Sequence, residues 1–92
     1  MNPPSADIEA LERIVIDALS AVSADAATAT RETEVLQLVD SLGLVMALSN
    51  VQEALDVALD PDEIIEVFQC RSIADVAVVL QAALSSRLTP QG

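Results

Sequence analysis

The pattern of apolar and polar positions predicts four helices, the first of which begins near residue 6. Its apolar residues recur at helical spacing and form one stripe, made of Ile8, Leu11, Val15, Ala18, Leu19 and Val22. Ser5 is a suitable N-cap for this helix, because serine side chains accept hydrogen bonds from the first turn. Residues 23–40 are expected to form a long connection. Its second half carries apolar residues expected to hold it on the core, namely Val35, Leu36, Leu38 and Val39.

The second predicted helix begins at Ser41 and runs to about Val57. Its inward face is expected to consist of Val45, Leu48, Val51, Leu55 and Leu59, with Ala47 and Ala54 as small neighbours. A short third helix follows, for which Asp60 suits the N-cap and Pro61 the first helical position, while Glu63 completes a capping box. The residues of this third helix that are expected to face inward are Ile64, Val67 and Phe68.

The last predicted helix opens with Ser72 as its cap and Asp75 three residues later. Its apolar stripe is Ile73, Val76, Ala77, Leu80 and Leu84, and residues 85–92 are expected to be a tail. Together the elements predict a single all-α domain over residues 1–92, with a helical core at about 6–84. The expected architecture is a four-helix bundle with a long first loop and a short third helix.

Composition narrows the possible functions. Apolar residues make up 52% of the chain, which is too many for a disordered protein. The formal net charge is −11, and such a charge repels the phosphates of nucleic acids. Without histidine, and with Cys70 as the single cysteine, the chain cannot build a zinc site of the usual kind. Lysine is also absent, so no familiar nucleophile and base pair is available and we do not expect an enzyme.

The compartment is indicated by what the sequence lacks. No stretch approaches the roughly 18 uninterrupted apolar residues that a membrane span needs. The first residues also lack the basic and apolar regions of a secretory signal. We therefore expect a cytoplasmic protein without membrane contact. Cys70 has no partner for a disulfide, and its simplest interpretation is a small, half-buried apolar residue.

The most informative stretch is residues 38–45, which place Ser41 at the end of the long connection and at the start of the second helix. A helix N-terminus favours a phosphate, so a phosphodiester on this hydroxyl would be well placed. From the residues alone, however, a plain N-cap is the favoured interpretation of Ser41. Two details weaken it: Leu44 cannot complete a capping box, and Gly43 in the first turn costs up to about 1 kcal/mol in helix propensity while removing bulk beside the serine.

Asp40-Ser41-Leu42, in a small acidic helical chain, resembles the attachment site of the acyl carrier proteins and of the related peptidyl and aminoacyl carrier domains. The resemblance covers roughly residues 6–84. It implies that Ser41 carries 4′-phosphopantetheine, which a phosphopantetheinyl transferase installs from coenzyme A, and that the transferase reads Asp40 and Leu42. The prosthetic thiol would then bear acyl or aminoacyl intermediates as thioesters for fatty-acid-, polyketide- or peptide-type biosynthesis.

The resemblance also implies a surface for the loading and downstream biosynthetic enzymes, on the exposed side of the second helix at Met46, Ser49, Gln52 and Glu53. The chain departs from the family in two ways. Leu38 stands where the family often has glycine, and the exposed side of the second helix has fewer acidic residues than many fatty-acid carriers. This second departure suggests more apolar contact with a specialised set of partners. We expect the carrier to be a free-standing monomer.

Two other interpretations remain. The chain could be an unmodified acidic interaction module that uses the same fold, with Ser41 as a simple cap. The acidic cluster at Asp56, Asp60, Asp62, Glu63 and Glu66 could weakly bind a divalent cation or basic enzymes, but a solvated, capping-rich surface explains it equally well.

Overall fold

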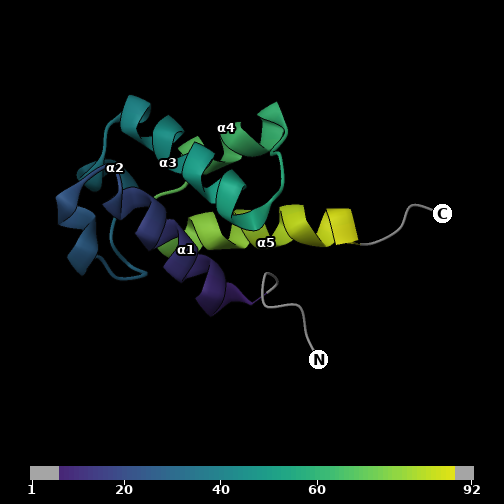
Figure 1. Cartoon of the computed structure of the whole chain (residues 1–92), viewed down its shortest axis with the longest axis horizontal. Helices are drawn as coiled ribbons and strands as arrows, with labels where there is room; N and C mark the ends of the chain where they lie inside the picture. The colour runs from purple at the N-terminus through teal and green to yellow at the C-terminus, as the bar shows by residue number, and fades with distance from the viewer. Residues whose placement is uncertain (1–6, 89–92) are drawn as a thin grey trace.

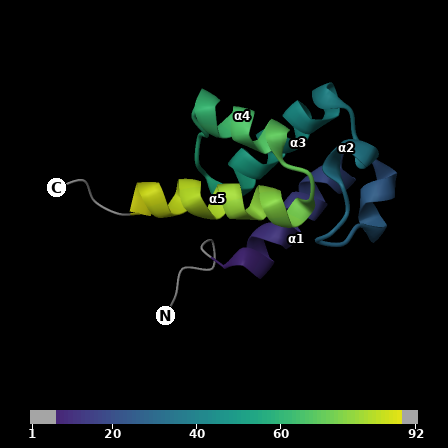
Figure 2. The same cartoon turned by 180° about the vertical axis from the view of Figure 1, so that it is seen from behind.

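The core lies where the longer helices of the chain meet. The structure is a computed structural model, and it describes residues 7–88. In chain order its elements are α1 (Ile8–Ser20), the 3-10 helix η2 (Ala24–Thr28), α2 (Val35–Leu38), α3 (Ser41–Leu55), α4 (Pro61–Gln69) and α5 (Ile73–Leu88), as Figures 1 and 2 show from opposite sides. No strand forms within residues 7–88, so the expected all-α class is confirmed.

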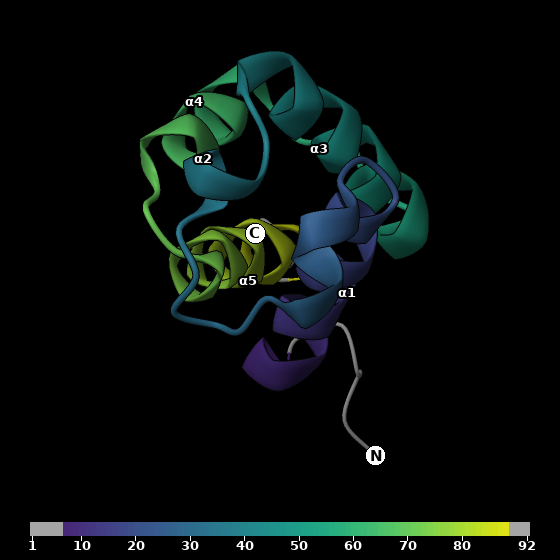
Figure 3. The ribbon, with the colours of Figure 1, turned by 90° about the vertical axis from the view of Figure 1, so that its left-hand side faces the viewer.

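Helices α1 and α5 form the most extensive contact between two elements of the fold. Figure 3 looks nearly along the axis of α5, with α1, α3 and α4 lying around it. Helix α1 packs against α5 and α3, and α4 packs against α5. The radius of gyration, 12.5 Å, is close to the value of about 12 Å expected for a compact chain of this length. The largest fully buried side chains are Leu11, Leu19, Val35, Val51, Val67, Ile73, Val76 and Leu80.

The starts of α4 and α5 confirm the expected capping residues. Asp60 and Glu63 form a capping box, in which the Asp60 N–H donates to Glu63 Oε1 at 2.8 Å, and Pro61 occupies the first helical position. At α5, the Asp75 N–H donates to Ser72 Oγ at 3.2 Å, and the Ser72 N–H donates to Asp75 Oδ2 at 3.4 Å. Each reciprocal pair satisfies backbone donors that a helix start leaves without intrahelical partners.

The long connection at residues 23–40 has more structure than expected, because it contains both η2 and α2. Its backbone pairs with the residues that open α5. The Val35 N–H donates to Arg71 O at 2.8 Å, and the Ile73 N–H donates to Thr33 O at 3.1 Å. An isolated antiparallel bridge lies between these two bonds. The connection is therefore held on the body of the protein shortly before it reaches Ser41.

An ion pair provides a second attachment for the connection. Arg31 Nε lies 3.1 Å from Glu12 Oε2, and the Glu12 side chain is only 11% exposed. The oxygen itself is buried on α1, so the guanidinium group compensates a carboxylate that has lost most of its water. The Arg31 carbonyl also accepts a hydrogen bond from the Ala74 N–H at 2.9 Å. Arg31 thus links α1, the connection and α5.

Three residues expected in or beside the core are exposed instead, and one of them is Ala54, which lies near the end of α3. Val45 is 46% exposed, because the buried face of α3 is centred on Leu44, Ala47, Leu48 and Val51. Leu36 is 53% exposed, while its neighbours Val35 and Val39 are buried. For Val45 and Leu36, the apolar residue directly before each of them, Leu44 and Val35, faces inward in its place.

The helix ends also differ from the expectations. Helix α3 ends at Leu55 rather than near Val57, and α5 continues to Leu88 rather than giving way to a tail at residue 85. Asp7 caps α1, with its Oδ1 accepting from the Glu9 N–H at 3.0 Å, whereas Ser5 lies outside the described residues. Among residues 7–88, no helix has both the length and the apolar character required to cross a membrane.

Candidate functional site

The start of α3 is built around Asp40, which takes the role that a plain cap would have given to Ser41. The backbone of Asp40 is extended, and its Oδ1 accepts a hydrogen bond from the Gly43 N–H at 2.8 Å. Asp40 is therefore the N-cap, and Ser41 is the first residue of the helix. The interpretation of Ser41 as a capping residue is wrong. A carboxylate in this position also interacts favourably with the positive end of the helix dipole.

Ser41 is exposed at the surface. Among the described residues, no hydrogen bond engages its hydroxyl group, which is neither folded inward nor covered by the preceding connection. The chain thus presents an unengaged hydroxyl at the first position of a helix. Such a group is accessible to an enzyme, and a phosphate attached to it would lie beside the positive end of the α3 dipole.

Gly43 allows the first turn of α3 to lie against the connection beneath it. A Cβ atom at this position would lie 2.9 Å from Val39 Cβ and 3.3 Å from both Asp40 Oδ1 and Val22 Cγ1. The first of these distances is too short for two carbon atoms. Gly43 is buried, so the space it leaves is filled from below rather than left open beside the serine. Its role is close packing under the site.

The side chains exposed beside Ser41 are apolar. Leu42, which was predicted as a motif neighbour, is 70% exposed, and Val45 and Met46 are 46% and 53% exposed. These residues are spaced by three and four positions, so they share one face of α3. Only Met46 among them was predicted as a partner residue. The exposure of Val45 was missed because α3 has a different rotation from the one that its sequence pattern suggested.

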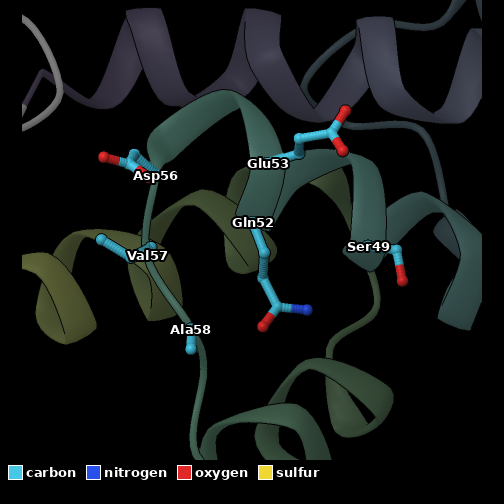
Figure 4. A pocket seen from close by; sticks show the side chains of 6 residues that line it. All are labelled: Ser49, Gln52, Glu53, Asp56, Val57 and Ala58. Atoms are coloured by element: carbon cyan, nitrogen blue, oxygen red, sulfur yellow. The ribbon is translucent and has the colours of Figure 1, made fainter.

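The other predicted partner residues line a shallow pocket at the far end of α3. Its volume is about 520 Å³, and Figure 4 shows Ser49, Gln52 and Glu53 together with Asp56, Val57 and Ala58 from the following loop. Met46 does not line it. The structure therefore divides the predicted surface between the two halves of the helix.

Gln52 has a structural role in that pocket. Its Oε1 accepts a hydrogen bond from the Leu59 N–H at 2.8 Å, and its Nε2 donates to Leu48 O at 3.2 Å. Figure 4 shows the side chain extending from α3 alongside the loop that carries Val57 and Ala58, while Glu53 points away from it. Gln52 is half-buried and holds the loop between α3 and α4 in place.

The same loop begins with a left-handed residue. Asp56 has a φ of 56°, and the Val57 N–H donates to Gln52 O at 3.1 Å while the Asp56 N–H donates to Glu53 O at 3.3 Å. This pair of bonds is a Schellman motif, which satisfies the last carbonyl groups of a helix. It explains why α3 stops at Leu55, although apolar residues continue to Leu59.

Cys70 lies between α4 and α5, half-buried as expected. Its Sγ donates to Glu66 O at 3.2 Å. Burial raises the pKa of the thiol to about 11, and the negative charges of Asp75 and Glu66 contribute to the same shift. The thiol is therefore protonated at neutral pH and is a weak nucleophile.

Acidic residues are numerous around α4, but several of them stabilise helix ends. Asp60 and Glu63 cap α4, and Asp56 terminates α3. Among residues 7–88, no group of three or more acidic or cysteine side chains is arranged to hold a metal ion.

Comparisons of this chain with protein-family models, curated proteins and solved structures gave no match. The indications of function in this chain are therefore the geometry around Ser41 and the sequence motif that contains it.

Proposed function

We propose that this protein is a carrier that bears acyl or aminoacyl intermediates as thioesters on a 4′-phosphopantetheine arm attached to Ser41. The observation that carries the proposal is the exposed, unengaged hydroxyl of Ser41 at the first position of α3, next to an aspartate that supplies the cap. A serine needed for capping would lose a stabilising bond on modification. Ser41 has no such bond to lose.

The proposed fold is the four-helix bundle of the carrier family. In this description α1, α3, α4 and α5 are the four helices, and η2 and α2 belong to the long first loop. The loop is attached to α5 by backbone pairing and to α1 through Arg31, so it delivers Ser41 to a defined position at the surface. The short third helix of the bundle is α4, which has 9 residues.

In the proposed modification, the Ser41 oxygen attacks the phosphorus atom next to the pantetheine portion of coenzyme A. A bond forms between Oγ and phosphorus, and the bond from that phosphorus to the bridging oxygen of the pyrophosphate breaks. Adenosine 3′,5′-bisphosphate leaves with the electron pair, and the hydroxyl proton passes to a base of the transferase. The chain contributes the position of the nucleophile and the dipole of α3, which favours the phosphodiester anion.

The remainder of the chain is compatible with a passive carrier. The sequence contains no histidine or lysine that could attack or hydrolyse a thioester, and Cys70 is held in its unreactive thiol form. Loading and downstream biosynthetic enzymes would supply the chemistry. We propose that the protein works in the cytoplasm, where coenzyme A is present, and its charge of −11 favours a monomer.

The test is the intact mass of the purified protein after incubation with coenzyme A and a broad-specificity phosphopantetheinyl transferase. We expect the wild type and Ser49→Ala to gain the mass of one phosphopantetheinyl group, and Ser41→Ala to gain none. Ser49 is the matched control, because it is another exposed serine on α3. An unmodified wild type, or an equal gain in Ser41→Ala, would refute the carrier function and favour the unmodified interaction module.

A further inference from the structure

The N-cap of α3 places a negative charge directly before the proposed attachment site. Asp40 Oδ1 accepts a hydrogen bond from the Gly43 N–H at 2.8 Å, and Ser41 is the next residue in the chain. The N-terminus of a helix is equivalent to about half a positive charge. This charge favours a single anion, but it is too small to compensate a carboxylate and a phosphodiester together.

The carboxylate of Asp40 has no positive side chain as a partner among those that the structure describes. The whole sequence has 4 basic residues against 15 acidic ones, and the arginine that forms an ion pair, Arg31, is engaged by Glu12 on α1. Asp40 is also exposed, so water competes with the Gly43 N–H for its carboxylate. The cap therefore depends on a modest balance, which one more negative charge can shift.

Modification of Ser41 adds a second anion beside the first. Adjacent Cα atoms are about 3.8 Å apart, so the phosphodiester would lie within about one screening length, ~8 Å at physiological ionic strength, of the Asp40 carboxylate. Two anions at this separation repel each other. The exposed Ser41 side chain leaves the phosphodiester in water, whereas the Asp40 carboxylate is fixed by its bond to Gly43. The repulsion is therefore relieved if that bond breaks.

We infer that attachment of phosphopantetheine to Ser41 releases the Asp40 cap, so that the Gly43 N–H loses its partner and the first turn of α3 loosens. The inference rests on the proposed carrier function and goes beyond it, because it describes a structural change that follows the modification. The Asp40 carboxylate is engaged in the unmodified protein and free in the modified one. An enzyme that acts on the loaded carrier can thus distinguish the two forms at the residue beside the arm.

Selective labelling with ¹⁵N-glycine tests this inference, because the sequence contains two glycines, Gly43 and Gly92. Gly43 reports on the cap, and Gly92, which is far from Ser41 in the chain, provides the reference signal. Amide hydrogen exchange with water is measured by NMR in the wild type and in Asp40→Asn, before and after phosphopantetheine transfer from coenzyme A that intact mass shows to be complete. Asparagine is the matched control, because it caps about as well as aspartate without the charge. Each protein is measured at about 0.01 M and about 1 M NaCl, where the screening lengths are about 30 Å and about 3 Å.

In the wild type at low salt, we expect modification to speed exchange at Gly43 by at least about threefold, which corresponds to about 0.7 kcal/mol, and to leave Gly92 unchanged. At high salt the increase should fall below about 1.5-fold, because the repulsion between the two anions is screened. In Asp40→Asn, modification should change the exchange by less than about 1.5-fold at both salt concentrations, since the neutral amide is not repelled.

A second pair of variants tests the same repulsion without the transferase. Ser41→Glu places a negative charge at the attachment position, and Ser41→Gln is its neutral match of nearly the same shape. With Asp40 present, we expect exchange at Gly43 to be at least about threefold faster in Ser41→Glu than in Ser41→Gln at low salt. In the Asp40→Asn background the two should agree within about 1.5-fold, because one of the two charges is gone. Circular dichroism verifies the helical content of each variant.

Exchange at Gly43 that is unchanged or slower after modification would overturn the release of the cap and leave the carrier function intact. An equal increase in the wild type and in Asp40→Asn would also overturn it, because the charge of Asp40 would then have no part in the effect. If the transferase does not modify Asp40→Asn, the comparison of Ser41→Glu with Ser41→Gln decides. A wild type that gains no mass would instead refute the carrier function, and the inference with it.

Discussion

The starts of α3 and α5 both place a serine beside a helix N-terminus, but the two serines differ in what their hydroxyl groups do. Ser72 precedes α5, and its oxygen accepts a hydrogen bond from the Asp75 N–H at 3.2 Å. Ser41 lies one position further into its helix, because Asp40 accepts the corresponding bond from Gly43 at 2.8 Å. Because Asp40 caps α3 one position before Ser41, the Ser41 hydroxyl is not needed for capping and is available for modification.

The surroundings of the two starts differ in the same sense. At α5, the Ile73 and Ala74 N–H groups donate to carbonyl groups of the long connection, so the first turn is covered by protein. At α3, the connection passes beneath the first turn, where Val39 and Val22 pack under Gly43, and the outer side remains open. The start of α5 is covered by the connection, whereas the start of α3 packs against the connection at Gly43 and is exposed to solvent at Ser41.

Among single substitutions at the two helix starts, we expect Gly43→Ala to have the largest effect on stability. The added Cβ would lie 2.9 Å from Val39 Cβ, so the first turn of α3 must move away from the connection. We expect a loss of about 1–2 kcal/mol in the free energy of unfolding, even after the better helix propensity of alanine is included. Urea denaturation measures this loss. Unchanged stability would mean that the packing under Ser41 is loose.

A second prediction concerns the thiol beside the start of α5. Because burial, Asp75 and Glu66 raise the pKa of Cys70 from 9.0 to about 11, its thiolate fraction at pH 8 is far below that of an ordinary cysteine. The lower thiolate fraction slows alkylation, and the greater nucleophilicity of the more basic thiolate offsets part of this decrease. On balance we expect alkylation by iodoacetamide to be about tenfold slower in the folded protein than in urea. The rate should rise with pH through about 11.

The control for this thiol is Asp75→Asn, which removes a negative charge that disfavours the thiolate and should speed alkylation at pH 8. The same shift affects stability. The folded state keeps the thiol protonated, so its contribution is present below pH 9.0 and is lost as the pH rises through about 11. Equal alkylation rates in the folded and unfolded chain would show that the α5 start does not suppress Cys70.

We expect the smallest effects from substitutions at the capping residues of α3 and α5. We expect Asp40→Ala and Ser72→Ala each to lower the free energy of unfolding by about 1 kcal/mol, because each leaves a backbone donor without its partner. Ser41→Ala should change it by less than about 0.5 kcal/mol, as for a surface substitution without a bond to lose. Thermal or urea unfolding of the three variants gives the ranking.

One result would contradict the expected order of the three losses in unfolding free energy. If Ser41→Ala is as destabilising as Ser72→Ala, the hydroxyl of Ser41 caps α3 in solution and is not available for modification. Asp40→Asn provides the control for charge, because asparagine caps about as well as aspartate.

The parts of the fold that sequence predicts are those with local causes. Asp60, Pro61 and Glu63 fix the start of α4 within one turn, and Ser72 with Asp75 fixes the start of α5 in the same way. The stripe of α5 could also be predicted, since its apolar residues at Ile73, Val76, Ala77, Leu80 and Leu84 are all buried. In each case the determining contacts lie within a few residues of one another.

The sequence-based predictions for α3 are wrong where its structure depends on contacts with residues distant in the chain. Asp40 and Ser41 can both cap a helix, and the choice is tied to how the first turn packs at Gly43 against Val39 and Val22. The packing of α3 buries Leu44 and leaves Val45 exposed. One signal was available in the sequence: the aspartate three residues before a glycine can cap that glycine's N–H without any steric cost.

The candidate site shows the same division. Ser41 could be located from its motif, whereas the role of Gln52 could not. Its amide accepts a bond from the Leu59 N–H, seven positions along the chain, across a turn whose left-handed residue is Asp56. Glycine or asparagine would have indicated such a turn more clearly than aspartate does.

The pairing of Val35 with Arg71 and of Thr33 with Ile73 has a consequence for the order in which the protein opens and closes. It joins the two ends of the segment that contains α2, α3 and α4, which turns this segment into a closed lobe. Closing the segment has an entropic cost, which is met once for α2, α3 and α4 together. Because α3 packs against α1 and α4 against α5, opening this segment breaks both contacts, and we expect hydrogen exchange in α3 and α4 to be faster than in α1 and α5, whose mutual contact is the most extensive in the fold.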